Sequence, residues 1–227
     1  MATFPTIIIV PGWRGSGPGH WQSLWAECLP RARRVMQDDW MSPSRRAWVE
    51  ALAQQVLEVP GPVVVAAHSL GCIATSHLPA QAAARIQGAL LVAPADPERR
   101  AVLNDFAPVP SRRLPYASIV VASSNDPYCP IRLAGAYARA WGSTFVRLQD
   151  AGHINVESGH GNWPLGLALL QSLMSASVPS ASSAKVAAMD QQRWHRSMLE
   201  VSCRDGATPL SGSRANLVAK GAGRLKV

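Results

Sequence analysis

Six short strand-like runs, most of them continuously apolar, are separated by segments with helical periodicity and constrain the fold of this chain more than any other feature. The predicted strands are residues 6–10, 33–37, 63–66, 88–92, 118–122 and 144–148. A strand that is apolar throughout has both faces buried, which is typical of a parallel sheet with helices on either side. The alternation of strands and helices therefore predicts an α/β fold with a helical layer on each face of one sheet.

The segments between these strands predict helices at residues 21–29, 43–57, 70–84, 131–141 and 164–174. In the second of these, Trp48, Leu52 and Val56 recur at helical spacing, and we expect Ser42 to cap the helix and Pro43 to be its first residue. Gly142 should end the fourth helix.

The charge of the chain is unevenly distributed along its 227 residues. The formal net charge of +8 would fit a nucleic-acid-binding protein, but residues 1–175 hold 14 Arg and 11 acidic residues and contribute only +3. The remaining +5 lies in residues 176–227, which open with a Ser- and Ala-rich stretch and show no sustained periodicity. We expect one domain over 1–175 followed by a basic, low-complexity and disordered tail, and no nucleic-acid partner.

No apolar run approaches the roughly 18 residues that a membrane span needs, and the N-terminus lacks the basic region of a signal peptide. The four Cys are scattered without a C-x-x-C pair. We therefore expect a cytoplasmic protein without a membrane association.

The strongest chemical signal follows the third predicted strand, where the chain reads Ala67-His-Ser-Leu-Gly71. This is a variant of the G-x-S-x-G nucleophile elbow, in which a tight strand-to-helix turn exposes a serine and requires small residues two positions before and after it. Ala67 and Gly71 meet that requirement. Ser69 is therefore the candidate nucleophile, although a serine that merely caps a helix would fit the same pattern.

A serine hydroxyl needs a general base that a third group orients. Asp126 follows the fifth predicted strand and His153 follows the sixth, which gives the chain order Ser, Asp, His of α/β-hydrolases. Asp96, after the fourth strand, is the alternative acid. We interpret His68 and Cys72 as packing residues, and no third ligand accompanies His153 and His160, so we expect no metal.

The Gly-rich loop after the first predicted strand, residues 11–21, should supply an oxyanion donor. We expect the backbone N–H groups of Trp13 and Leu70 to form the pair, with Arg14 as an alternative to Trp13. The loop fits neither nucleotide-binding pattern, because His20 and Pro18 replace the required Gly and Lys. The Trp13 and Trp21 side chains could form an apolar wall beside the site.

Several of these segments together resemble one family. They are Pro-Gly-x-x-x-Ser-Gly-Pro-x-His-Trp-Gln at 11–22, Gln-Asp-Asp-Trp at 37–40, Ala-His-Ser-Leu-Gly-Cys at 67–72, Asn-Asp-Pro-Tyr-Cys at 125–129 and Gly-His-Ile-Asn-x-Glu-Ser-Gly at 152–159. The chain is similar over about residues 4–175 to the small serine hydrolases that include bacterial YdeN-like proteins and eukaryotic retinoblastoma-binding protein 9. The resemblance implies a three-layer α/β-hydrolase fold with mainly parallel strands in the order 2-1-3-4-5-6, a triad of Ser69, Asp126 and His153, and no cofactor.

The function that we expect is hydrolysis of a small ester, thioester or amide through an acyl-enzyme. Only about 24 residues, 95–118, separate the fourth and fifth predicted strands, where larger relatives insert a lid. We therefore expect an uncovered site without a lid domain and a small acyl substrate. Because the family includes a partner-binding member, the alternative is a protein-interaction module on a hydrolase scaffold with little or no activity. The sequence names no protein partner.

Overall fold

A computed structural model describes residues 4–175 of the chain. Within that range lie the six expected strands and all the candidate site residues. The disordered basic tail that we expect over residues 176–227 lies outside the described residues.

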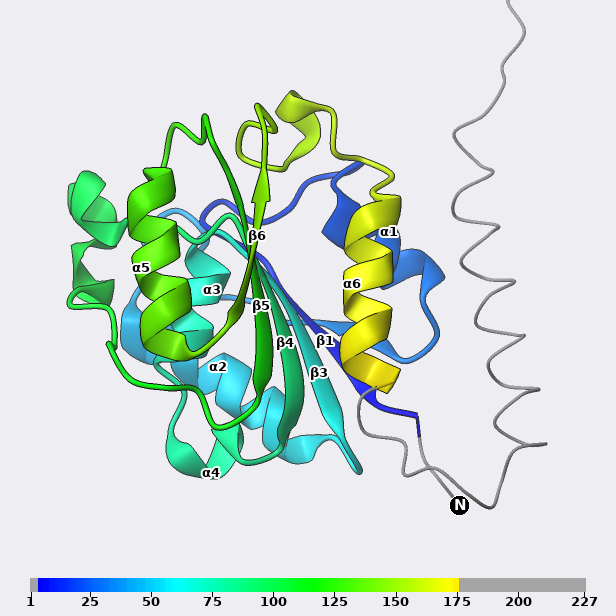
Figure 1. Cartoon of the computed structure of the whole chain (residues 1–227). Coiled ribbons are helices and arrows are strands. Elements are labelled where there is room, and N and C mark those ends of the chain that lie inside the picture. Colours follow the sequence, from blue (N-terminus) through cyan, green and yellow to red (C-terminus); the bar gives the residue numbers. More distant parts are fainter. Residues whose placement is uncertain (1–3, 176–227) are drawn as a thin grey trace, which may run out of the picture.

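The centre of the molecule is one six-stranded sheet in which every neighbouring pair is parallel (Figure 1). The strand order is β2-β1-β3-β4-β5-β6, as expected. The strands are β1 (Thr6–Val10), β2 (Ala32–Arg34), β3 (Val63–His68), β4 (Ile86–Val92), β5 (Ala117–Ser123) and β6 (Thr144–Leu148). Both faces of β1 and β3 are fully buried, which explains their continuous apolar sequence.

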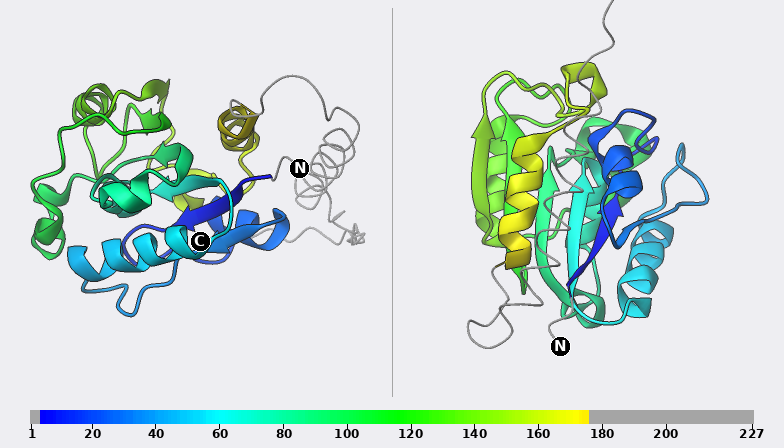
Figure 2. Two further views of the ribbon diagram at one scale, coloured as in Figure 1. Left: turned by 90° about the horizontal axis from the view of Figure 1, so that it is seen from below. Right: turned by 90° about the vertical axis from the view of Figure 1, so that its right-hand side faces the viewer.

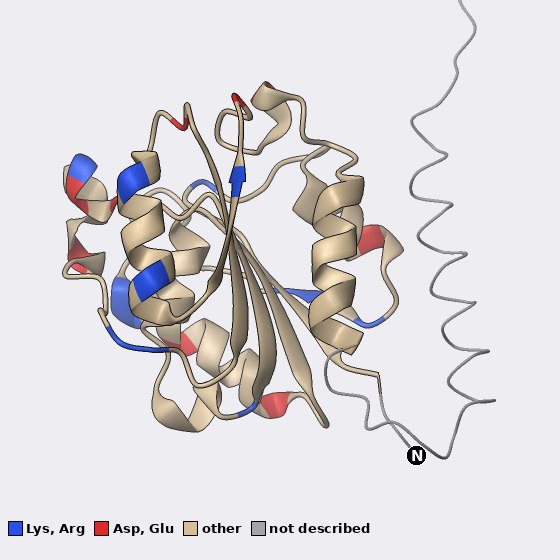
Figure 3. Ribbon diagram, viewed as in Figure 1, with Lys and Arg blue, Asp and Glu red and all other residues tan. Residues whose placement is uncertain are grey.

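Helices cover both faces of the sheet and make the fold three-layered. Helices α1 (Trp21–Cys28) and α6 (Pro164–Ser175) lie on the face that the right-hand view of Figure 2 presents. Their core includes Trp21, Trp25 and Trp163. The opposite face carries α2 (Arg45–Glu58), α3 (Leu70–Ser76), α4 (Ala80–Ala83) and α5 (Ile131–Trp141), and its core includes Trp48 and Trp141. Helix α6 has no charged side chain (Figure 3).

Two helix boundaries differ from the sequence prediction. The predicted helix 70–84 is interrupted, because a proline disfavours helical backbone in the residue before it, and Pro79 separates α3 from α4. The predicted start of α2 at Pro43 was wrong: Ser44 occupies the N-cap position without a side-chain cap, and the first helical N–H, of Arg45, donates to Asp105 Oδ2 at 2.6 Å.

The connection from β4 to β5 contains two short 3₁₀ helices, η1 (Pro97–Arg99) and η2 (Ala101–Phe106), and no inserted domain. This agrees with the expected absence of a lid domain. Among the described residues, no helix is both long and apolar enough to cross a membrane.

Candidate active site

Ser69 lies in a tight turn between the end of β3 and the start of α3. Its φ of +54° and ψ of −121° place a non-glycine residue in a strained conformation, which is typical of a nucleophile elbow. The Ser69 N–H donates to Val92 O at 2.9 Å and thereby ties the turn to the end of β4. A Cβ at position 71 would clash with Val10 O and lie 2.7 Å from Pro11 O, so the elbow requires glycine there.

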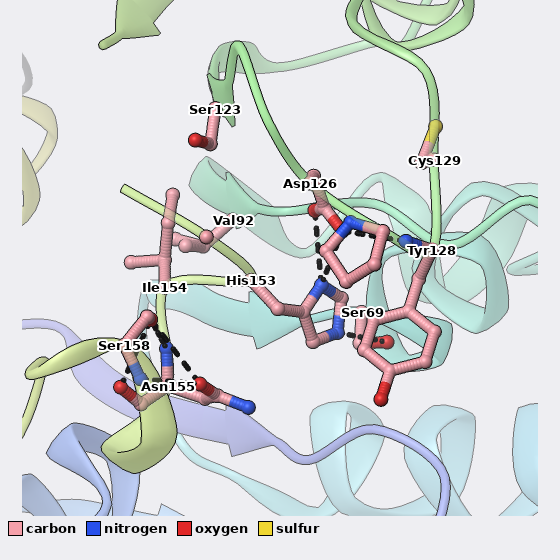
Figure 4. Close-up of polar contacts among 12 residues, drawn as sticks. Ser69, Val92, Ser123, Asp126, Tyr128, Cys129, His153, Ile154, Asn155 and Ser158 are labelled. Atoms are coloured by element: carbon pink, nitrogen blue, oxygen red, sulfur yellow. Dashed lines mark hydrogen bonds and ion pairs between the residues drawn. The ribbon is translucent and has the colours of Figure 1, made fainter. Parts of the chain in front are cut away.

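The structure brings His153 and Asp126 to this serine from the loops after β6 and β5 (Figure 4). His153 Nε2 lies 3.0 Å from Ser69 Oγ, and His153 Nδ1 lies 3.0 and 2.9 Å from the two carboxylate oxygens of Asp126. The His153 and Asp126 side chains are 9% and 2% exposed. The three predicted triad residues therefore form one continuous chain of hydrogen bonds.

The carboxylate determines the tautomer of His153. A carboxylate only accepts hydrogen bonds, so Nδ1 carries the ring proton and donates it to Asp126. The neutral ring then has a free electron pair on Nε2, which accepts the hydroxyl proton of Ser69. Asp126 Oδ1 also accepts the Tyr128 N–H at 2.8 Å, so the aspartate forms a local turn as well as orienting the histidine.

Sequence reasoning missed the residues that hold the histidine loop. Asn125 Oδ1 accepts the Gly152 N–H at 2.8 Å, and Ser123 Oγ accepts the Ala151 N–H at 2.9 Å. The only signal in the sequence was the position of Asn125 beside Asp126. The Tyr128 ring lies over His153 with 4.5 Å between centroids.

Two further histidines are buried behind His153. His68 Nε2 donates to His153 O at 2.9 Å, in agreement with its interpretation as a packing residue, and burial lowers its pKa well below the ordinary value. The His20 ring lies 4.8 Å from that of His68, and burial together with the charges of His153 and Arg34 lowers its pKa to about 4. Both rings are therefore neutral near pH 7, which avoids placing positive charge beside His153.

Two backbone N–H groups near Ser69 are free for an oxyanion. Neither the Trp13 nor the Leu70 N–H donates to an acceptor among residues 4–175. The Arg14 N–H, which was the alternative to Trp13, instead donates to Trp40 O at 3.1 Å. The hydrogen bonding therefore favours the Trp13 and Leu70 pair.

A cavity of about 510 Å³ opens onto Ser69 and His153. Trp13 and Tyr128 line it, together with charged side chains that include Arg14 and Arg100. The expectation that Trp21 also forms its wall was wrong, because Trp21 is fully buried in the α1 and α6 core and its Nε1 donates to Ile154 O at 3.0 Å.

The alternative site residues have other roles. Asp96, the alternative acid, accepts the Glu98 N–H at 3.2 Å and caps η1. Cys72 is fully buried, and burial raises the pKa of its thiol, which is the opposite of what a thiolate nucleophile needs. Within residues 4–175, no group of three or more His, Cys, Asp or Glu side chains is arranged to hold a metal ion.

The comparisons with known proteins agree with this geometry. The sequence model of the family described as Serine hydrolase matches residues 7–172. A protein from Pectobacterium atrosepticum described as a YdeN-like hydrolase is 34% identical, with a TM-score of 0.71, over 78% of this chain and 94% of that one. No curated protein sequence matches the chain.

More distant solved structures share the fold. The ydeN gene product of Bacillus subtilis is 20% identical with a TM-score of 0.59, over 75% of this chain and 99% of that one. Est1E from Butyrivibrio proteoclasticus, solved with ferulic acid bound, is 13% identical with a TM-score of 0.54, over 76% of this chain and 87% of that one.

Proposed function

Because the chain belongs to the serine hydrolase family, we propose that it cleaves small esters, thioesters or amides through an acyl-enzyme on Ser69. The observation that supports this most directly is the continuous hydrogen-bond chain from Ser69 Oγ through His153 to Asp126. A serine hydroxyl with such a base can act as a nucleophile, whereas an isolated one is a poor nucleophile.

In the first half-reaction, Ser69 Oγ attacks the substrate carbonyl carbon as its proton passes to His153 Nε2. Asp126 holds the ring in the required tautomer and stabilises the imidazolium. The carbonyl oxygen becomes an oxyanion, which accepts hydrogen bonds from the Trp13 and Leu70 N–H groups. Collapse of this intermediate breaks the bond to the leaving group, which takes the proton from His153.

In the second half-reaction, water attacks the ester carbonyl of acylated Ser69. His153 accepts the proton of the water and then returns it to Ser69 Oγ as the carboxylic acid leaves. The enzyme is thus restored without a metal or a cofactor in any step. The short connection from β4 to β5 leaves a cavity of about 510 Å³, which favours a small substrate.

The test is the steady-state hydrolysis of p-nitrophenyl acetate and butyrate by the wild type and Ser69→Ala. We expect the substitution to lower kcat by about 10⁴-fold or more, because it removes the nucleophile. Ser172→Ala, which truncates an exposed serine on α6, is the matched control and should retain wild-type rates. Equal activity of the wild type and Ser69→Ala would exclude the proposed mechanism.

A further inference from the structure

Three arginines surround the cavity beside Ser69 and come from two separate segments. Arg14 lies in the loop after β1, whereas Arg99 and Arg100 lie at the end of η1. The Arg14 and Arg100 guanidinium carbons lie 4.4 and 5.5 Å from the Trp13 ring centroid, so both groups face the same indole. Arg100 also lies 5.4 Å from the Tyr128 ring.

None of these arginines forms an ion pair with another residue in the part of the chain that the structure describes. The only ion pair within residues 4–175 joins His153 to Asp126. Arg99 Nη1 donates to Pro127 O at 2.8 Å, whereas Arg14 and Arg100 donate no side-chain hydrogen bond to an acceptor in this part of the chain. Stacking on an aromatic ring leaves the N–H groups at the edge of a guanidinium available for a ligand.

The acidic residues at the cavity do not neutralise these groups. Asp96 and Glu157 also line it, but neither has a carboxylate oxygen within 4 Å of a guanidinium nitrogen. The Asp96 carboxylate accepts the Glu98 N–H instead. Among residues 4–175, Arg14 and Arg100 therefore have no ion-pair partner, and they bring positive charge to the cavity that opens onto Ser69.

Arg100 lines the same cavity as Ser69 and His153 and is linked to His153 through one aromatic ring. It contacts the Tyr128 ring, and that ring in turn packs on His153 with 4.5 Å between centroids. A substrate whose carbonyl is held at Ser69 could reach the Arg100 guanidinium with another group a few bonds away. A planar guanidinium with free N–H groups matches the geometry of a carboxylate.

We propose that the substrate is an anionic ester, with a carboxylate that Arg100 and Arg14 bind while its scissile carbonyl lies at Ser69. This inference rests on the proposed hydrolase function and adds a substrate class to it. The aromatic rings of Trp13 and Tyr128 hold the guanidinium groups in place before the substrate arrives, so fewer side-chain rotamers are lost on binding.

The experiment compares matched pairs of esters that differ in one charge. One pair is 4-acetoxybenzoate and its neutral methyl ester, with the charge on the leaving group. The other is mono-p-nitrophenyl adipate and its methyl ester, with the charge on the acyl group. We expect kcat/KM for the anionic member of at least one pair to exceed that of its neutral partner by about tenfold, mainly through a lower KM.

The Arg14→Gln, Arg100→Gln double variant should bring this ratio close to one. Arg139→Gln, on an exposed position of α5 away from the cavity, is the control and should keep the wild-type ratio. High salt should also reduce the preference, because charge attraction at an exposed site is screened.

Neutral esters that are cleaved as well as the anionic ones in both pairs, or a ratio unaffected by the double variant, would overturn the anionic substrate class and leave the hydrolase function standing. Failure of the hydrolase function looks different: the wild type would then cleave none of the four esters, and the inference would fall with it.

Discussion

At the scale of single residues, the turn that carries Ser69, the proposed nucleophile, depends on a glycine that lets neighbouring backbone approach it closely. An ideal Cβ on Gly12 would lie 2.7 Å from Ser69 Cβ, 3.3 Å from Ser69 Oγ and 3.1 Å from His68 O. The constraint at Gly12 is space, since its backbone does not have a positive φ. The loop with the proposed oxyanion donor and the turn with the proposed nucleophile are therefore in close contact at this glycine.

We expect Gly12→Ala to lower kcat/KM for p-nitrophenyl acetate by about 10²-fold, because the added methyl group must displace the Ser69 side chain or the Trp13 N–H. Gly17→Ala, in the same loop, is the control, because a Cβ there meets no atom within 4 Å. A Gly12→Ala enzyme within twofold of the wild type would contradict this account of the close approach.

Ser69, Asp126 and His153 could be predicted from the sequence because each follows a separate strand, and the ends of parallel strands meet at one edge of a sheet. The residues that support this site, such as Asn125 and Arg100, could not be predicted from the sequence. Asn125 acts on Gly152, 27 positions away, and Arg100 faces Trp13 through space. Nothing in the local sequence of either residue indicates its partner.

At the scale of secondary structure elements, a buried amide side chain connects α1 to the sheet through hydrogen bonds. Gln22 is fully buried, and its Nε2 donates to Val10 O of β1 at 3.0 Å and to Ala66 O of β3 at 2.9 Å. Ser16 Oγ in turn donates to Gln22 Oε1 at 2.6 Å. This network of hydrogen bonds joins β1 and β3 to the loop that carries Trp13.

We expect Gln22→Met to lower the free energy of unfolding by about 2–4 kcal/mol, because the variant removes the hydrogen bonds that the buried amide donates to the Val10 and Ala66 carbonyls and leaves the Ser16 hydroxyl without its acceptor. Gln54→Met, at an exposed position of α2, should change it by about 0.5 kcal/mol at most. Urea denaturation measures both values. Unchanged stability of Gln22→Met would show that other groups or water satisfy these carbonyls.

The burial of each element explains how well the sequence predicted its position. The central strands carry continuous apolar sequence because both their faces are buried, and they were found nearly at their observed positions. Strand β2 was placed at 33–37 but spans Ala32–Arg34, because this edge strand is only partly buried and Arg33 and Arg34 conceal it. The start of α2 depends on Asp105, 60 positions away from Arg45, which no local pattern could reveal.

At the scale of the whole molecule, two buried histidines, His20 and His68, are neutral in the folded protein. Burial lowers the pKa of His68 well below its ordinary value and, with nearby charges, that of His20 to about 4. The unfolded chain takes up protons on these groups below about pH 6.5, whereas the folded chain does not. The stability that they contribute is therefore present above pH 6.5 and is lost as the pH falls towards 4.

We expect the free energy of unfolding to fall between pH 6.5 and 5 with a slope of about 1 kcal/mol per pH unit for each of these two histidines. In His20→Asn the slope should be shallower by one such contribution, while the asparagine still accepts the Gln22 N–H that His20 accepts now. Denaturant titrations of the wild type and His20→Asn at pH 7, 6 and 5 would measure this difference in slope. A free energy of unfolding that does not change over this pH range would show that these histidines do not remain neutral in the folded protein.

We propose above all that Ser69 is an activated nucleophile in the folded protein. The most direct measurement is the reaction of the folded chain with a fluorophosphonate probe, followed by mass spectrometry of the labelled peptide. We expect one adduct, on Ser69, that Ser69→Ala and prior heat unfolding both abolish. A folded protein that takes up no label, or a label that persists in Ser69→Ala, would contradict it.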